Sequence, residues 1–121
     1  MGKTIMIVDD EHSFHELYMV MLENTDYKII HVYDGEEALS KLEQEKPDLI
    51  ILDILLDMMT GDSLFLYLKG MPEYADIPVI VISIFPERDY RSLRDTEPNL
   101  VYLEKPVEKE RLIKEIEAKI G

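Results

Sequence analysis

The chain has 121 residues, no cysteine and a formal net charge of −13 at pH 7. Its length is that of one domain, and the absence of cysteine excludes disulfides and thiolate metal sites, which fits a reducing compartment. The acidic balance argues against direct binding to nucleic acid or anionic lipid and favours protein partners, although ordinary helix surfaces that keep a domain in solution carry similar charge.

The sequence also lacks the usual membrane signals. No apolar run approaches the roughly 20 residues that span a bilayer, and the N-terminal residues lack a signal-peptide pattern. We therefore expect residues 1–121 to form a single cytoplasmic domain with no membrane contact.

The first predicted elements are a strand and a helix separated by acidic residues. Residues 4–8 form an apolar run typical of a strand buried on both faces, and three acids, Asp9-Asp10-Glu11, follow it. Apolar residues at helical spacing then predict a helix over about 12–24, with Ser13 and Glu16 in a capping-box pattern at its start.

The next segments continue the alternation of strand and helix. Residues 27–32 are strand-like, and a cap signature that begins at Asp34 opens a helix that must stop before Pro47. The run Leu49-Ile50-Ile51-Leu52 indicates another strand buried on both faces. Asp53 follows directly at the carboxyl end of this strand.

The second half of the chain starts with an irregular stretch and a further helix. Gly61 leads into this helix and Gly70 ends it. Residues 78–82 indicate a fourth strand, with Ser83 at its end. The segment 86–97 is polar and weakly periodic, so we expect a helix of low stability there.

A short strand over 100–103 and a helix from 107 onward complete the pattern. Five strands thus alternate with five helices, which predicts right-handed crossovers and a doubly wound parallel sheet with helices on both faces. The expected α/β fold is flavodoxin-like with strand order 2-1-3-4-5. Strands one and three are then neighbours, which brings Asp9 and Asp10 beside Asp53.

Polar side chains gather at the carboxyl edge of this predicted sheet. Three carboxylates at the ends of adjacent strands repel one another, and a divalent cation with a preference for oxygen ligands, Mg²⁺, relieves the repulsion. Ser83 and Lys105 follow strands four and five at the same edge. A nucleophile at Asp53, a metal, a hydroxyl donor and a fixed positive charge are what phosphoryl transfer to a carboxylate requires.

Several short motifs stand in one order along the whole chain. They are Val8-Asp9-Asp10-Glu11, Leu52-Asp53, Gly61, Ser83, Tyr102 and Lys105-Pro106. In this order and approximate spacing, the sequence resembles the receiver domain of two-component response regulators.

The resemblance implies a phosphoacceptor that uses Mg²⁺. Asp53 is expected to take a phosphoryl group from a histidine kinase or a histidine phosphotransfer protein. Asp10, Asp53 and the backbone carbonyl of Ile54 are expected to hold Mg²⁺, with Asp9 acting mainly through bound water. Such a domain is not a turnover enzyme, because it catalyses only its own aspartyl phosphorylation and slow autodephosphorylation.

The resemblance also implies a conformational switch. Ser83 and Lys105 are expected to contact the phosphoryl oxygens, and the bond between Lys105 and Pro106 is expected to be cis. Movement of Ser83 and an inward turn of the Tyr102 ring would reshape the surface of the fourth helix, fifth strand and fifth helix for an unknown downstream protein. For Tyr102, the simpler interpretation is an edge-strand aromatic that covers the core.

Some positions depart from the family pattern. Asp57 stands where Pro is usual, Thr60 where Asp is frequent, and Ile84 where a small residue is usual. The bulk of Ile84, with Leu55 and Phe85 nearby in sequence, is expected to shield the phosphorylated aspartate and slow its hydrolysis.

Other functions are compatible with parts of the pattern. A Mg²⁺-dependent phosphohydrolase usually has its nucleophile after the first strand, and a flavodoxin would need phosphate-binding groups where this chain has acids. A receiver-fold binding module that does not cycle phosphate is the principal alternative, because Asp57 and Ile84 depart from the pattern. The three histidines are expected to have surface or packing roles; they are His12, His15 and His31.

Overall fold

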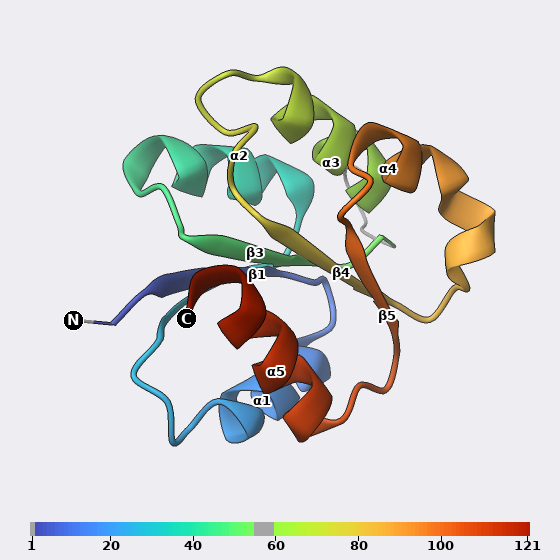
Figure 1. The fold of residues 1–121 in the computed structure, drawn as a ribbon. Helices are drawn as coiled ribbons and strands as arrows, with labels where there is room; N and C mark the ends of the chain where they lie inside the picture. Colours follow the sequence, from blue (N-terminus) through green and yellow to red (C-terminus); the bar gives the residue numbers. More distant parts are fainter. Residues whose placement is uncertain (1, 55–59) are drawn as a thin grey trace.

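A parallel five-stranded sheet forms the centre of the computed structural model, which describes residues 2–54 and 60–121 (Figure 1). The strand order is β2-β1-β3-β4-β5, which confirms the flavodoxin-like prediction. The strands are β1 (Thr4–Val8), β2 (Lys28–Val32), β3 (Leu49–Leu52), β4 (Val79–Ser83) and β5 (Val101–Glu104).

Helices cover both faces of the sheet. They are α1 (His12–Met21), α2 (Gly35–Gln44), α3 (Gly61–Gly70), α4 (Arg91–Thr96) and α5 (Lys109–Ile120), with a short 3-10 helix, η1 (Glu87–Tyr90), before α4. Figure 1 shows α1 and α5 on one face and α2, α3 and α4 on the other. In the part of the chain that the structure describes, no helix has both the length and the apolarity needed to cross a bilayer.

The central strands are apolar at every position because both of their faces are covered. In β1, Ile5 and Ile7 face the core under α1 and α5, whereas Met6 and Val8 face the core under α2 and α3. This alternation follows from the two-residue period of a strand. Both cores are therefore built from the same short runs.

Strand register aligns the ends of β1 and β3. Val8 lies opposite Leu52, so the residues that follow, Asp9 and Asp53, leave the sheet side by side. The ladder continues one step further, since the Asp53 backbone N–H donates to the Val8 carbonyl at 2.9 Å. The sheet thus sets the spacing of the two acids.

The predicted capping box at the start of α1 is wrong. The helix begins at His12 after Glu11, and its first residue has no side-chain cap. The Glu11 backbone N–H instead donates to the Asp9 carboxylate at 2.9 Å, which turns the chain directly into the helix. Ser13 is already helical, whereas a capping residue needs extended backbone. The helix also ends at Met21, before the expected residue 24.

The predicted cap of α2 is confirmed. The Asp34 carboxylate accepts a hydrogen bond from the Glu37 backbone N–H at 2.8 Å. The Glu37 carboxylate in turn accepts from the Tyr33 backbone N–H at 2.7 Å. These reciprocal bonds satisfy backbone donors that a helix start leaves unpaired.

The weakly periodic segment 86–97 contains two short elements instead of one helix. The 3-10 turn η1 ends at Tyr90, whose φ of −133° interrupts the helical conformation before α4 begins. Leu93 is the one buried residue of α4. A single apolar anchor is too little to stabilise a longer helix at this edge of the sheet.

Candidate functional site

Three carboxylates meet at the carboxyl ends of β1 and β3. Asp9, Asp10 and Asp53 each place a carboxylate oxygen within 4.8 Å of the others. Asp9 and Asp53 are buried, with 1% and 5% of their surface exposed, and Asp10 is partly exposed. Because oxygen ligands suit hard divalent cations, this cluster can hold a metal ion such as Mg²⁺.

Lys105 supplies the positive charge of this acid cluster. Its Nζ donates to Asp9 Oδ2 at 2.8 Å and to Asp53 Oδ2 at 3.2 Å, and its side chain is 4% exposed. The ammonium also lies 3.7 Å from the centre of the Phe14 ring, a contact that sequence reasoning missed. The expected cis bond between Lys105 and Pro106 is present.

The negative charge of the same region affects the pKa of the Tyr18 hydroxyl. Tyr18 is 1% exposed on the inner face of α1. Burial, followed by the charges of Asp9 and Asp53, raises the pKa of its hydroxyl. The carboxylates therefore act on a neighbouring group even with Lys105 beside them.

Gly61 allows the backbone to pass close to Asp53. Its N–H donates to the Ile54 carbonyl at 2.7 Å. A Cβ at this position would lie 2.1 Å from the Asp53 carbonyl oxygen and 2.6 Å from the Ile54 Cα, so only glycine fits. The Ile54 carbonyl keeps a second lone pair, which leaves room for the predicted metal contact.

Ser83 is the last residue of β4, and Tyr102 lies within β5. Ser83 is fully buried, and its Oγ accepts a hydrogen bond from the Phe85 backbone N–H at 3.1 Å. The Tyr102 hydroxyl donates to the Phe85 carbonyl at 2.8 Å. Burial raises the pKa of Tyr102, and a hydrogen bond with Ser83 acts in the opposite direction. Both predicted switch residues thus contact the loop that follows β4.

Two histidines that the sequence analysis assigned to surface or packing roles form polar contacts beside the acids. His15 is 3% exposed, and its Nε2 lies 2.6 Å from the Asp9 carbonyl oxygen. Its Nδ1 lies 2.8 Å from Nδ1 of His31. From the sequence, only the pairing of β2 with β1 could have indicated this contact, because that pairing places His31 opposite Ile7.

Two of the three positions that depart from the family pattern, Thr60 and Ile84, lie within the described residues. Leu55 and Asp57 lie outside the described residues. Thr60 is exposed and its hydroxyl donates to Ser63 Oγ at 2.9 Å. Ile84 is 58% exposed, so its side chain lies at the surface.

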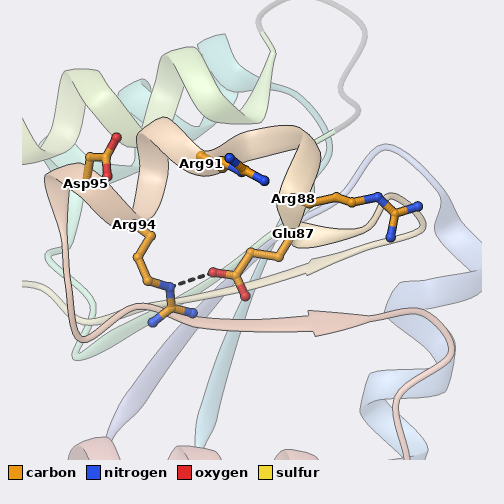
Figure 2. Close-up of a pocket in the computed structure, with 5 residues that line it drawn as sticks. All are labelled: Glu87, Arg88, Arg91, Arg94 and Asp95. Carbon is orange, nitrogen blue, oxygen red and sulfur yellow. Dashed lines mark hydrogen bonds and ion pairs between the residues drawn. The ribbon is translucent and has the colours of Figure 1, made fainter.

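A surface pocket of about 370 Å³ lies on η1 and α4, downstream of Ser83. It is lined by Glu87, Arg88, Arg91, Arg94 and Asp95. Figure 2 shows Arg94 paired with Glu87, while the side chains of Arg88 and Arg91 do not join this pair. The pocket contains none of the clustered acids, and it belongs to the surface that the sequence analysis expected to meet a partner.

The family was tested by comparison with known proteins. The model of the response regulator receiver domain matches residues 5–117. The chain belongs to this family. It is a receiver domain of two-component signalling, a family of response regulator domains and not of classical enzymes.

Relatives support this assignment over different lengths. The polar-differentiation response regulator DivK of Brucella anthropi is 32% identical over 122 residues, which cover 100% of this chain and 98% of DivK. The alkaline phosphatase synthesis transcriptional regulatory protein PhoP of Bacillus subtilis is 51% identical over 61 residues, which cover 50% of this chain. That match spans 25% of PhoP, so this receiver corresponds to only part of the longer regulator.

Solved structures agree with the fold. The signal receiver domain of a signal transduction histidine kinase from Syntrophus aciditrophicus has a TM-score of 0.88 and 32% identity, covering 98% of this chain and 90% of that one. The Mn²⁺-bound form of response regulator Rcp1 has a TM-score of 0.81 and 27% identity, covering 97% of this chain and 91% of that one.

Proposed function

We propose that this receiver domain accepts a phosphoryl group on Asp53, from a histidine kinase or a histidine phosphotransfer protein, with Mg²⁺ bound at the acid cluster. The observation that carries the proposal is the cluster of three carboxylates, two of which are buried and paired with the ammonium group of Lys105. Residues 1–121 act as one domain in this proposal.

Asp53 is the acceptor because of its position in the cluster. It follows the central strand β3, and Lys105 holds one of its oxygens at 3.2 Å. In the transfer, a carboxylate oxygen of Asp53 attacks the phosphorus atom of a phosphorylated histidine. The new O–P bond forms as the N–P bond breaks, and the electron pair of that bond returns to the imidazole nitrogen.

The remaining residues bind the metal and the phosphoryl oxygens. Asp10, Asp53 and the Ile54 carbonyl would hold Mg²⁺, and Asp9 would act through bound water. When bound, the ion supplies positive charge that offsets the charge on the transferred group. The response regulator Rcp1 has been crystallised with Mn²⁺, which supports a divalent ion here.

Lys105 and Ser83 would hold the phosphoryl group after transfer. The Lys105 ammonium already lies at Asp53, so it can move from the carboxylate to a phosphoryl oxygen without a large rearrangement. Ser83 would leave its contact with the Phe85 N–H to donate its hydroxyl to another oxygen. Phosphorylation adds charge and acceptor atoms that favour this exchange.

Movement of Ser83 would displace Phe85, and through it the surface expected to contact a partner. The Phe85 carbonyl accepts the Tyr102 hydroxyl, and the Phe85 ring lies 6.1 Å from the Tyr90 ring in η1. A shift of this loop would therefore change the surface of α4, β5 and α5 that meets an unidentified downstream protein. The output is a change in the populations of two conformations.

The proposal is tested by incubation with acetyl phosphate and Mg²⁺, followed by intact-mass measurement. The wild type should gain the mass of one phosphoryl group, and Asp53→Asn should gain none. Asp48→Asn is the matched control, because Asp48 lies at the other end of β3, where it accepts the Thr4 N–H at 2.8 Å. That variant should be phosphorylated like the wild type.

A phosphorylated histidine phosphotransfer protein should be used as a second donor, because a small donor and a protein donor approach the site differently. A wild type that gains no mass from either donor would refute the proposal and favour a receiver-fold module that does not cycle phosphate. We also expect slow hydrolysis of the phosphorylated product, because the bulk of Ile84, with Leu55 and Phe85, would restrict the access of water to Asp53. Loss of the group within seconds would contradict that expectation.

A further inference from the structure

A pair of histidines, one buried and one partly exposed, lies behind the acid cluster. His15, on the inner face of α1, is 3% exposed and contacts the Asp9 carbonyl oxygen through Nε2 at 2.6 Å. His31, on β2, meets Nδ1 of His15 with its own Nδ1 at 2.8 Å. Both distances are those of hydrogen bonds. A chain of two imidazoles therefore connects β2 to the turn between β1 and α1.

The chemistry of the carbonyl group determines where the protons lie in this chain. A carbonyl oxygen only accepts, so Nε2 of His15 must carry a proton and donate it. In a neutral His15, Nδ1 is then an acceptor, and Nδ1 of His31 must be the donor. Burial and, to a lesser extent, His15 lower the pKa of His31, which fits a neutral ring there.

The accepted hydrogen bond orients the acid that follows. The Asp9 carbonyl belongs to the planar peptide unit that joins Asp9 to Asp10, so holding its oxygen fixes the plane from which the Asp10 side chain departs. The Asp9 backbone N–H is held separately by the Val32 carbonyl at 3.1 Å. The turn is thus held on both sides of the Asp9 Cα.

We propose that His15, held in one tautomer by His31, is a positioning residue that orients Asp10 through the carbonyl group of Asp9. The effect on metal binding rests on the proposed function, whereas the hydrogen-bonded chain itself does not. His15 touches neither a metal nor a phosphoryl group in this proposal. It acts on the direction of one carboxylate.

The first test measures the tautomers directly. Long-range ¹H–¹⁵N NMR of the wild type, labelled with ¹⁵N-histidine, distinguishes protonated from unprotonated ring nitrogens. We expect His15 to be protonated at Nε2 and His31 at Nδ1, at a pH where both are neutral. A neutral His31 protonated at Nε2 would overturn the proposal, whatever the outcome for Mg²⁺ or phosphorylation.

The second test compares variants of His15. His15→Leu removes the donor, whereas His15→Gln places an amide donor near the position of Nε2. Titration with Mg²⁺ by NMR should show about tenfold weaker binding for His15→Leu, at the lower end for residues that orient metal ligands, and near wild-type binding for His15→Gln. A merely structural role would not be rescued in this way.

His12→Leu is the matched control. His12 lies on the same helix and stacks on Tyr33, whose ring His15 also contacts at a tilt, with ring centres 4.3 Å apart in both pairs. This control should bind Mg²⁺ like the wild type. A folded His15→Leu variant with wild-type affinity would refute the positioning role. If the wild type itself binds no Mg²⁺, the proposed metal site fails, and the tautomers still decide whether the hydrogen-bonded chain exists.

Discussion

The acid cluster and the surface of η1 and α4 both bring charged side chains together, but the two regions differ in their access to water. In the acid cluster, the side chains of Lys105, Asp9 and Asp53 are 4%, 2% and 6% exposed. On η1 and α4, the paired side chains of Arg94 and Glu87 are 42% and 37% exposed. Both regions contain charge-assisted hydrogen bonds, yet water screens only the second.

This difference determines what each region can do. Removal of one member of a buried ion pair leaves an uncompensated charge, whereas an exposed pair contributes little to stability. The acid cluster is therefore strongly coupled to folding and to any ion that enters it. The charged side chains on η1 and α4 can exchange ion-pair partners with little change in the free energy of unfolding. Four predictions test this contrast, in order of decreasing effect.

Lys105→Met should give the largest effect. In buffer without divalent ions, the free energy of unfolding should fall by about 3–5 kcal/mol, because buried carboxylates lose their counter-charge. Urea denaturation measures this, and added Mg²⁺ should narrow the difference. Lys28→Met is the control, since Lys28 pairs with Glu45 at the surface and should cost less than about 1 kcal/mol. Equal losses in the two variants would break the contrast.

Gly61→Ala should give the next largest effect. Its Cβ would collide with the Asp53 carbonyl oxygen, so the backbone at Asp53 must move, at a cost of about 2–3 kcal/mol. Gly70→Ala is the matched control on the same helix, where the added Cβ meets no atom within 4 Å apart from its chain neighbours and the backbone of its own helix. That change should stabilise the protein by about 0.5–1 kcal/mol. A stable Gly61→Ala variant would show that the site tolerates displacement.

Tyr102→Phe tests the boundary between the two regions. The variant loses the hydrogen bond to the Phe85 carbonyl, and we expect a loss of about 1 kcal/mol in the free energy of unfolding. Tyr67→Phe, an exposed tyrosine on α3, should be neutral by comparison. Thermal or urea unfolding of both variants provides the measurement. A Tyr102→Phe variant with the wild-type free energy of unfolding would show that this hydrogen bond does not stabilise the contact between β5 and the loop after Ser83.

Arg88→Ala and Arg91→Ala should have the smallest effect. Both side chains are exposed, and neither has an ion pair within the described residues. Each change should alter the free energy of unfolding by less than about 0.5 kcal/mol, and phosphorylation by acetyl phosphate should stay at the wild-type level. A loss above about 1 kcal/mol in either variant would place this surface with the buried cluster instead.

Sequence periodicity was sufficient for the architecture. The apolar runs before Asp9 and Asp53 predicted two neighbouring strands, and the register of Val8 with Leu52 brings those acids together. The clustering of these acids could be predicted because parallel strands bring the residues that follow them to one edge of the sheet. Helix boundaries were less predictable, since the hydrogen bond from Glu11 to Asp9 overrode the capping pattern at Ser13.

By itself, then, the sequence determined the strand order and which acids, hydroxyl and lysine follow the strands, because those depend on local periodicity and chain direction. Only the tertiary structure decided that Lys105 lies over Phe14, and that His15 and His31 meet behind the Asp9 carbonyl. Those contacts join side chains from separate elements. Their distances depend on how the helices pack against the sheet, and no spacing along the chain encodes them.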